Sequence, residues 1–259
     1  MKKPVVTEPP HLGADLKELK LPSVAAHWAR LAEEAQRKRQ PHAEYLADLV
    51  HAEINDRRER RIARLIQAAH FPVLKTLDGF DFGSQAALDR EAVLDLADAR
   101  FLAEHRNVVL MGEVGTGKTH LAIALGLAAC QHEHRVRFAT AAELANMLVE
   151  AKQAGRLARK LEQLARHELF VLDELGYVPF DKVGADLLFS FVSRVYERRS
   201  LIVTTNLPFA RWNEVFLDNT AAAAVIDRVV HHALILKTEG ESYRLKDAKR
   251  RAAKKARAS

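Results

Sequence analysis

The sequence predicts an α/β fold, in which a parallel sheet is flanked by helices on both faces. Two observations lead to this prediction. Between residues 85 and 245, short apolar runs alternate with helical patterns, which is the order of consecutive βα units. The run LFVLD at 169–173 is continuous and apolar, as expected for a parallel strand that is covered on both faces. A small all-helical region precedes this part of the chain.

The apolar runs and their boundaries place the individual elements of the α/β region. Thr140 and Glu143 have the spacing of a capping box, which predicts a helix start. Strands are expected at 107–111, 135–139, 169–173, 201–206 and 233–237, and helices at 119–131, 142–153, 186–199 and 221–232.

The remaining segments differ in composition from the α/β region. Apolar residues recur at helical spacing before residue 70, and Pro22 and Pro41 divide this stretch into three helices. The predicted organisation is a Pro-rich, disordered N-terminus at 1–15, a helical domain at 16–70, a linker at 71–84, the α/β domain at 85–245 and a basic tail at 246–259.

Composition limits the class of protein. The chain has 259 residues and 48% hydrophobic residues, which is enough for one sizeable domain with a small appendage. Its single cysteine, Cys130, excludes an intramolecular disulfide and a cysteine-based zinc cluster. The N-terminus lacks a signal peptide's apolar segment, and no run is long enough to span a membrane, so we expect a soluble, cytoplasmic protein without a membrane partner. The net charge of +6 is concentrated in clusters, which favours nucleic acid as a partner.

The stretch from Gly112 to Thr119 has the pattern G-x-x-x-x-G-K-[ST], between a predicted strand and a predicted helix. Such a loop binds phosphates through backbone N–H groups and the positive end of the helix dipole. Lys118 is expected to reach the β- and γ-phosphates of ATP, and the Thr119 hydroxyl to ligate Mg²⁺. The alternative is a glycine-rich turn without a ligand, and Glu113 is interpreted as a solvated charge. The predicted nucleotide-binding residues are Gly112, Val114, Gly115, Thr116, Gly117, Lys118, Thr119 and His120.

Polar residues at the ends of two other strands complete this interpretation. Asp173 ends the run at 169–173 and is expected to hold Mg²⁺, whereas Glu174 is placed to polarise the attacking water. Asn206, with Thr205 as second choice, ends the run at 201–206 and is expected beside the γ-phosphate. The alternatives are solvated strand-end carboxylates, and an asparagine that starts a turn before a proline.

Four motifs together resemble the IstB-type transposition helper ATPases, which are AAA+ proteins related to DnaC-type helicase loaders and the DnaA initiator. These motifs are GEVGTGKTHLA, LFVLDELGYVPF, IVTTNLPFARW and VIDRVVHHALILKTEGESYR. Residues 20–246 are similar to the family. The resemblance implies an ATPase that assembles into an oligomer on duplex DNA and recruits or stimulates an IstA-type transposase. It also implies an active site shared between subunits, in which Arg228 reaches the neighbour's γ-phosphate; an arginine paired with Asp227 on a helix surface is the alternative.

The short segment after the last predicted strand leaves no room for the helical lid of many AAA+ proteins. This agrees with the resemblance, which implies a short or absent lid and strong coupling between assembly and ATP binding.

Three basic clusters are candidate DNA contacts. They lie near the end of the N-terminal helices, between the second and third strands, and in the tail from Lys246 to Arg257. Each could equally be a solvated helical face, but initiator-type ATPases have a DNA-lining insertion near the second strand, which favours the middle cluster. Contacts to phosphates would be tolerant of sequence and sensitive to salt. The candidate residues are Arg57, Arg58, Arg61, Lys152, Arg156, Arg159 and Lys160.

Two other functions remain open from the sequence. A replicative helicase loader uses the same ATP site and differs mainly in its N-terminal domain. A passive DNA-binding module with a degenerate nucleotide site is disfavoured because Lys118, Thr119, Asp173 and Glu174 are all intact.

Overall fold

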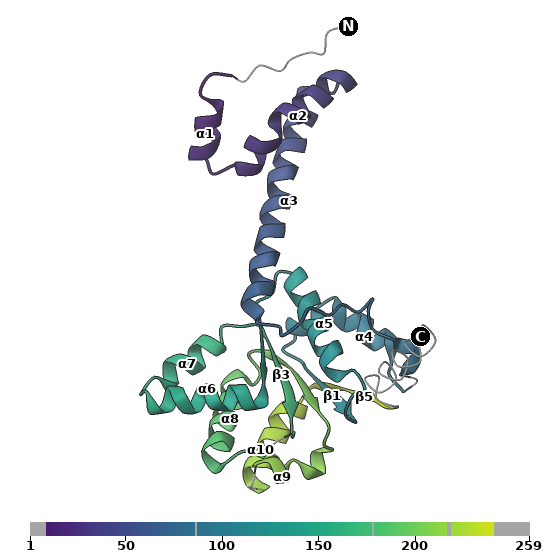
Figure 1. Cartoon of the computed structure of the whole chain (residues 1–259), viewed down its shortest axis with the longest axis vertical. Helices are drawn as coiled ribbons and strands as arrows, with labels where there is room; N and C mark the ends of the chain where they lie inside the picture. Colours follow the sequence, from purple (N-terminus) through teal and green to yellow (C-terminus); the bar gives the residue numbers. More distant parts are fainter. Residues whose placement is uncertain (1–8, 86, 178, 217–218, 241–259) are drawn as a thin grey trace, which may run out of the picture. The chain divides into compact units, whose positions relative to one another are not determined.

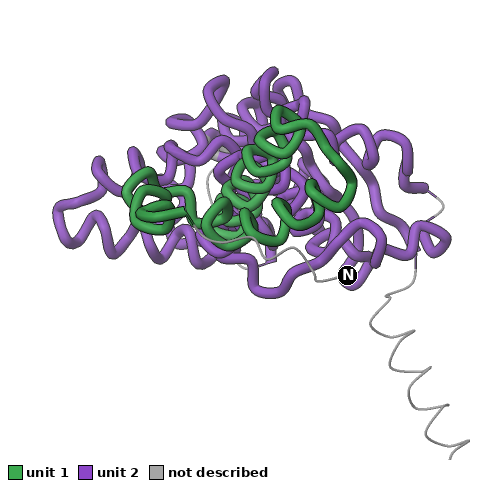
Figure 2. Tube along the Cα trace, turned by 90° about the horizontal axis from the view of Figure 1, so that it is seen from above, with its two compact units in different colours: residues 1–64 green, residues 65–259 purple. Residues whose placement is uncertain are grey.

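The computed structural model describes residues 9–85, 87–177, 179–216 and 219–240. The chain divides into two compact units, residues 1–64 and 65–259, which Figure 2 shows in different colours. The sequence boundary between the helical and α/β regions was expected at residue 70, a few residues later. Within the described residues, no helix is long and apolar enough to cross a membrane.

The first unit consists of helices, as predicted. They are α1 (Leu12–Glu18), α2 (Pro22–Lys38) and α3 (His42–Ala69), whose last residues from Leu65 on belong to the second unit (Figure 1). Pro22 is the first residue of α2, where its missing N–H is not needed. Helix α1 begins inside the segment expected to be disordered, because Leu16 finds a buried position; residues 1–8 lie outside the described part.

A buried carboxylate, Glu53, joins two helices of this unit. Glu53 is 4% exposed and accepts hydrogen bonds from the backbone N–H groups of Ser23 (2.9 Å) and Val24 (3.2 Å) at the start of α2. Arg57 Nε donates to it at 2.7 Å, and Arg57 also donates to the carbonyl of Lys20. Burial by itself raises the pKa of Glu53, but these hydrogen bonds outweigh it and hold the pKa below its ordinary value. Glu53 therefore stabilises the fold as a carboxylate.

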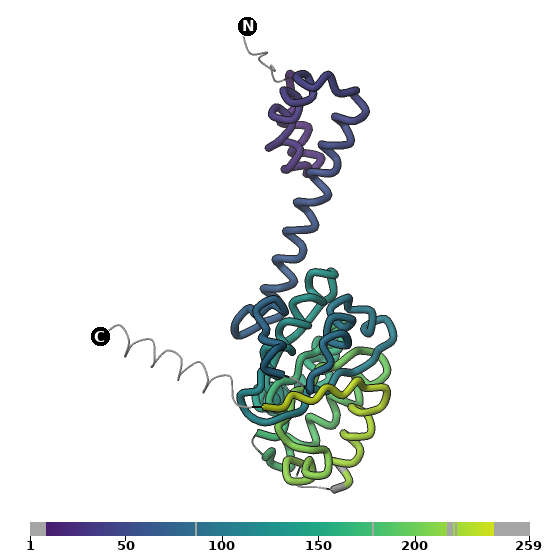
Figure 3. The backbone as a smooth tube through the Cα atoms, turned by 90° about the vertical axis from the view of Figure 1, so that its right-hand side faces the viewer, coloured from purple at the N-terminus to yellow at the C-terminus, as the bar shows by residue number. Residues whose placement is uncertain are grey.

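The second unit contains a five-stranded sheet, in which every pair of neighbouring strands is parallel. The order across the sheet is β2-β3-β4-β1-β5, and Figure 3 shows β5 as the yellow edge strand. The strands lie within a residue or two of the predicted runs, at Asn107–Gly112 (β1), Val136–Thr140 (β2), Leu169–Leu175 (β3), Ser200–Thr205 (β4) and Ala233–Thr238 (β5).

Helices cover both faces of this sheet. Alternate residues of β3 point to opposite faces: Val171 packs in the cluster with α4 and α5, and Phe170 and Leu172 pack in the cluster with α6, α8 and α10 (Figure 1). The predicted doubly covered α/β fold is confirmed. The helices are α4 (Arg90–Ala97), α5 (Lys118–Gln131), α6 (Ala141–Gln153), α7 (Leu157–Leu164), α8 (Lys182–Val195), α9 (Asn213–Phe216) and α10 (Asn219–Val230), with short 3-10 turns at Phe82–Ser84, Arg100–Leu102 and Phe209–Arg211.

Helix boundaries follow local caps. The capping box of Thr140 and Glu143 is present at the start of α6, as predicted. Helix α8 begins four residues before its predicted start because the Asp181 side chain accepts a hydrogen bond from the Gly184 N–H at 2.7 Å. Helices α4, α7 and the short α9 were not predicted, and α7 carries part of the middle basic cluster.

The segment 71–84, predicted as a linker, packs within the second unit. Phe71 lies 6.2 Å from Phe138 between ring centroids, and Leu77 and Phe80 pack on the core cluster beside α5. The partly buried apolar side chains hold this segment against α5. The segment therefore forms one wall of the site described next.

Candidate nucleotide-binding site

The glycine loop runs from the end of β1 to the start of α5, as the sequence predicts. Close packing explains two of its glycines. A Cβ at Gly112 would lie 2.0 Å from the carbonyl oxygen of Thr238, and one at Gly117 would lie 2.7 Å from the Phe80 ring. Gly117 also has φ +96°, which disfavours any other residue. The loop is therefore fixed by β5 on one side and by the segment 71–84 on the other.

Side chains of the loop make hydrogen bonds to its own backbone. Lys118 Nζ donates to the carbonyls of Gly112 (2.7 Å) and Glu113 (2.6 Å). The hydroxyl of Thr116 is buried, donates to the Glu113 carbonyl at 2.8 Å and lies 2.7 Å from the Thr238 hydroxyl. Glu113 itself is exposed, and Val114 is 54% exposed. Thr116 thus serves the shape of the loop, and Thr238 is a contact that the sequence did not indicate.

The first residues of α5 and the end of β3 meet at Asp173. The Thr119 hydroxyl lies 3.0 and 3.1 Å from the two carboxylate oxygens of Asp173, and the Thr204 hydroxyl on β4 donates to Oδ1 at 2.5 Å. The structure therefore brings together the two predicted metal ligands, Thr119 and Asp173.

Asp173 is 3% exposed, and this burial raises the pKa of its carboxyl group. Hydrogen bonds from Thr204 and Thr119, and the positive charge of Lys118, act in the opposite direction but do not cancel the effect. The carboxylate is thus held in a poorly solvated place by neutral hydroxyl donors. A bound cation would supply the missing charge, and an oxygen pair of this kind suits Mg²⁺.

Glu174 adopts an unusual backbone conformation. Its φ is +59°, in the left-handed region, and the ladder between β3 and β4 is irregular between Leu172 and Leu175. Its N–H donates to the Thr204 hydroxyl at 2.9 Å, while its side chain is exposed at the mouth of a small cavity shared with Thr140 and Tyr177. The strain turns Glu174 away from the sheet, beside the buried Asp173.

The end of β4 lies between the glycine loop and Asp173, since β4 pairs with both β1 and β3. Asn206 follows β4 directly and is partly exposed, so its position suits the predicted role. Thr205 is buried and accepts a hydrogen bond from the Leu207 N–H at 3.1 Å, within the following turn. Thr204, which the sequence interpretation overlooked, bonds both Asp173 and Glu174; strand alternation places it on the same side as Asn206 and was the available signal.

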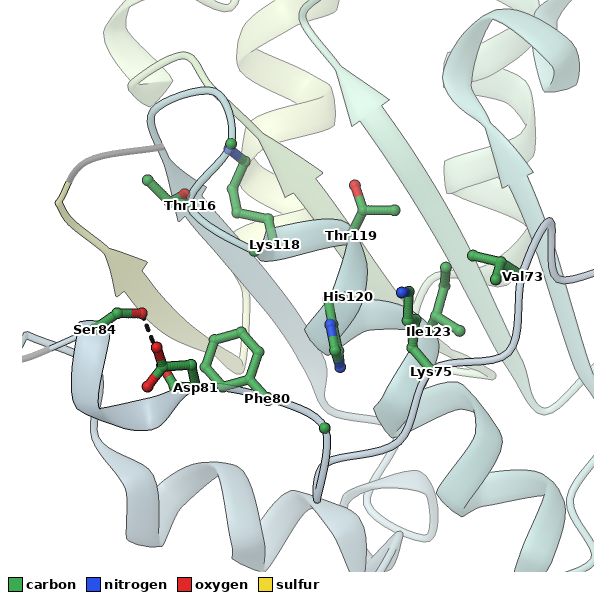
Figure 4. A pocket seen from close by; sticks show the side chains of 13 residues that line it. Val73, Lys75, Phe80, Asp81, Ser84, Thr116, Lys118, Thr119, His120 and Ile123 are labelled. Atoms are coloured by element: carbon green, nitrogen blue, oxygen red, sulfur yellow. Dashed lines mark hydrogen bonds between the residues drawn. The ribbon is translucent and has the colours of Figure 1, made fainter. Parts of the chain in front are cut away.

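A cavity of about 280 Å³ opens beside the loop, and Figure 4 shows its lining. One side is lined by Lys118, Thr119 and His120, which are among the predicted nucleotide contacts. The His120 ring nitrogen Nε2 lies 2.9 Å from the Thr76 carbonyl, and the Phe80 ring stands edge-on to His120 at 5.4 Å. The opposite wall comes from the supposed linker and was missed because its apolar residues are too irregularly spaced to predict an element: Val73, Lys75, Gly79, Phe80, Asp81 and Ser84.

Arg228 lies near the C-terminal end of α10, away from the loop. Its backbone carbonyl accepts from the Asn107 side chain at the start of β1, whereas the loop follows the end of that strand. The Arg228 guanidinium lies 5.0 Å from the Phe189 ring centroid and 5.9 Å from that of Tyr196, and it donates to the Ala224 carbonyl at 2.9 Å. The structure therefore does not bring Arg228 to the site within its own subunit.

The basic clusters have different surroundings. Arg156, Arg159 and Lys160 line a cavity of about 430 Å³ between α6 and α7, while Lys152 on α6 is not part of its lining. In the N-terminal unit, Arg57 is engaged with Glu53 and Lys20, so it has a structural role besides any DNA contact. Arg58 and Arg61 are exposed on α3. The tail from Lys246 to Arg257 lies outside the described residues.

The fold and the site define a P-loop nucleotide-binding protein of the AAA+ class. The chain matches the family described as IstB-like ATP binding protein over residues 14–252, and it belongs to that family. It is 42% identical over 235 residues to the ATP-binding protein of insertion sequence IS21 from Pseudomonas aeruginosa, covering 91% of this chain and 89% of the relative. It is 37% identical over 229 residues to the IS5376 ATP-binding protein of Geobacillus stearothermophilus, covering 88% and 91% of the two chains.

Solved structures agree on the fold. AMPPCP-bound DnaA from Aquifex aeolicus aligns with a TM-score of 0.54 at 21% identity, over 69% of this chain and 54% of DnaA. At this level of identity the likeness concerns the fold alone, and it confirms the predicted AAA+ core.

Proposed function

We propose that this protein is a Mg²⁺-dependent ATPase that assembles on duplex DNA and recruits or stimulates the transposase of its insertion sequence. The observation that carries the proposal is the contact of Thr119 with a buried Asp173, beside Lys118, in a chain of the IstB-like family. The relatives' names associate them with insertion sequences and with ATP. These names favour a role in transposition over the alternative of a helicase loader.

Each site residue has a proposed task. When ATP binds, Lys118 gives up its hydrogen bonds to the carbonyls of Gly112 and Glu113 and binds the β- and γ-phosphates instead. Hydrogen bonds to charged phosphate oxygens are stronger than those to neutral carbonyls. Thr119 and Asp173 hold Mg²⁺, which neutralises phosphate charge when bound. Glu174 polarises the attacking water, and Asn206 orients it near the γ-phosphate. The base is expected to lie against Phe80 and His120, in the cavity beside the loop.

Arg228 is proposed to act on the nucleotide of a neighbouring subunit. The length of β1 separates it from its own loop, which corresponds to roughly 16 Å for five residue steps. Such a distance excludes a contact with its own nucleotide and favours an active site completed by oligomerisation. An arginine in this role typically accelerates phosphoryl transfer by about 10³–10⁵-fold.

The cavity between α6 and α7 is the proposed main contact with duplex DNA. Arg156, Arg159 and Lys160 place three positive charges around it against one carboxylate, Glu150, and the described residues that line it include no aromatic side chain. Contacts to phosphates without base stacking give binding that is independent of sequence and weakened by salt. The N-terminal unit, with Arg58 and Arg61 exposed, is a second candidate for DNA or transposase binding.

The test compares the wild type with Glu174→Gln and Lys118→Ala. Sedimentation with ATP and duplex DNA should show an assembly that Glu174→Gln traps and Lys118→Ala prevents, while only the wild type hydrolyses ATP. Wild-type hydrolysis by Glu174→Gln would contradict the assignment of the water-polarising residue. ATP-independent assembly of Lys118→Ala would instead support a passive DNA-binding module.

Pull-down experiments separate the two partner hypotheses. The ATP-bound wild type should retain its cognate IstA-type transposase and not the replicative helicase. Retention of the helicase alone would identify a loader.

A further inference from the structure

The edge of the sheet opposite the glycine loop is rich in arginine and histidine side chains. The backbone enters each of the five strands at this edge, and each of the five preceding loops carries arginine or histidine. None of these residues belongs to the proposed ATP or DNA contacts. They are His105 and Arg106 before β1, His134 and Arg135 before β2, Arg166 and His167 before β3, Arg198 and Arg199 before β4, and His231 and His232 before β5.

Three of these loops form a cavity with the residues before β3. Its volume is about 200 Å³, and its lining is Leu102, Ala103, His105, His134, Glu168, Arg198 and Arg199. A second cavity, of about 190 Å³, shares Arg198 and Arg199 and is otherwise lined by Glu162, Ala165 and Arg194. Arg198 and Arg199 therefore line both cavities.

The two carboxylates that line these cavities, Glu168 and Glu162, already have partners. Glu168 lies 3.0 Å from His134 Nδ1 and accepts a hydrogen bond from the Arg135 N–H at 3.0 Å. Burial raises the pKa of Glu168, but these contacts outweigh burial and the net pKa is lowered, so Glu168 is ionised. Glu162 lies 3.2 Å from Arg194. Arg135 Nε also lies 3.6 Å from Glu168, so both acids have an arginine partner other than Arg198 and Arg199.

The charges of Arg198 and Arg199 are not compensated in the same way. Within the described residues, no carboxylate oxygen lies within ion-pair distance of either guanidinium. Arg199 is instead held by backbone carbonyls, with Nε donating to Ala165 and Nη1 to Arg198, both at 2.8 Å. A guanidinium that is fixed by neutral acceptors keeps its full charge and loses little entropy when it binds an anion.

We propose that the cavity at Arg198 and Arg199 binds a phosphate group. Two neighbouring guanidiniums offer forked N–H donors, which match phosphate oxygens, and His105 and His134 add ring nitrogens to the lining of the cavity. The cavity is smaller than the one beside the glycine loop, so it suits a phosphate group rather than a whole nucleotide. The phosphate belongs either to a DNA backbone or to a free phosphate compound.

The test uses Arg198→Gln with Arg100→Gln as its matched control. Arg198 makes no side-chain hydrogen bond within the described residues, so its loss should leave the fold intact. Arg100 lies in the 3-10 turn before β1 and is equally a single positive charge, but it pairs with Asp98 at 3.1 Å and lines neither cavity. Equal melting temperatures and equal ATP affinities of both variants establish that folding and the nucleotide site are preserved; if Arg198→Gln fails this check, His105→Gln replaces it.

Two measurements distinguish the sources of phosphate. Fluorescence anisotropy of a labelled duplex, with a non-hydrolysable ATP analogue, gives the DNA affinity as a function of salt. If a DNA phosphate binds here, Arg198→Gln should reduce the salt slope by about one and weaken binding about fivefold at 0.15 M salt, and Arg100→Gln should not. Titration with inorganic phosphate, followed by the ring NMR signals of His105 and His134, tests the free source.

The outcomes separate this inference from the proposed function. Signal shifts with inorganic phosphate in the wild type, lost in Arg198→Gln, support the cavity even if the protein binds no DNA and the proposed function fails. An unchanged salt slope together with unshifted histidine signals overturns the inference. Shifts with polyglutamate but not with phosphate also overturn it, because they would indicate an acidic protein partner.

Discussion

Two buried carboxylates have opposite electrostatic environments: Glu53 in the first unit, residues 1–64, and Asp173 in the second. The first is called the N-terminal unit, and the second, residues 65–259, is named the ATPase unit after its proposed function. They are almost equally buried, at 4% and 3% exposure. Glu53 receives two backbone N–H groups and a guanidinium, and its pKa is lowered; Asp173 receives two hydroxyl groups, and its pKa is raised. The same chemical group is thus stabilised as an anion in one place and left under-compensated in the other.

The different surroundings of Glu53 and Asp173 indicate which of the two carboxylates binds a ligand. A buried charge with fixed cationic partners contributes to folding, whereas one that lacks them costs free energy until a cation binds. Glu53 is therefore a structural residue, and Asp173 is a candidate metal ligand. The same reasoning distinguishes Arg57, whose guanidinium is committed to Glu53, from Arg198, which has no carboxylate partner among the described residues.

The largest expected effect is on ATP hydrolysis. Asp173→Asn should reduce the Mg²⁺-dependent rate by about 10²-fold or more, because a metal ligand of phosphoryl transfer contributes several kcal/mol to the transition state. Glu53→Gln should leave the rate per folded molecule unchanged. Steady-state phosphate release at saturating ATP and varied Mg²⁺ measures both, and a shared loss would contradict the division into structural and functional carboxylates.

The second effect concerns the stability of the N-terminal unit. Glu53→Gln should destabilise it by about 2 kcal/mol, because hydrogen bonds to a charged group are replaced by weaker ones and the α2 N-terminus loses its anion. Hydrogen–deuterium exchange of α2 and α3 peptides in the full chain provides the measurement.

Glu34→Gln is the control for this effect, since Glu34 pairs with Arg30 on the exposed surface of α2 and such pairs contribute little. Equal exchange in both variants would show that Glu53 does not stabilise the unit.

The third effect has the opposite sign. Asp173→Asn should stabilise the nucleotide-free ATPase unit by about 1 kcal/mol, or a melting temperature higher by about 2–4 °C, since the amide oxygen can still accept from Thr204 and Thr119 without a buried charge. Trp28 and Trp212 lie in different units, so a Trp28→Phe background leaves the fully buried Trp212 to report on this unit alone. A lower melting temperature would mean that the charge of Asp173 is compensated in the empty site.

The role of Asp173 could be predicted from the sequence, whereas the role of Glu53 could not. The glycine loop, Asp173 and the five strands follow from a motif and from apolar runs, which are local signals. Glu53 was recognised only as part of a helical pattern. Its partners Ser23 and Val24 are about thirty residues away, and no sequence pattern predicts these contacts. Helical periodicity gives the face of a helix but not the partner of a buried charge.

Local signals also failed where function depends on packing between segments. Phe80 and His120 meet only because residues 71–84 fold over α5, and Thr238 reaches Thr116 only through the pairing of β5 with β1. Thr204 was overlooked in favour of Asn206 and Thr205. Strand alternation puts Thr204 and Asn206 on one side of the strand, but no local signal shows that this side faces Asp173. The strand order, which decides these neighbours, is not contained in any single segment.

The smallest effect is the pH dependence of stability, and it should differ in sign between the two units. Glu53 has a lowered pKa in the folded state, so its contribution is complete above the ordinary value of 4.5 and is lost as the pH falls through the folded value. Asp173 has a raised pKa, so its contribution is present below the ordinary value of 3.8 and is lost as the pH rises through the folded value. Exchange measurements between pH 7 and 4 should therefore show the N-terminal unit weakening on acidification in the wild type more than in Glu53→Gln. Asp173→Asn should increase the stability of the ATPase unit more at pH 7 than at pH 4. An equal increase at both pH values would contradict an unfavourable burial of the Asp173 charge.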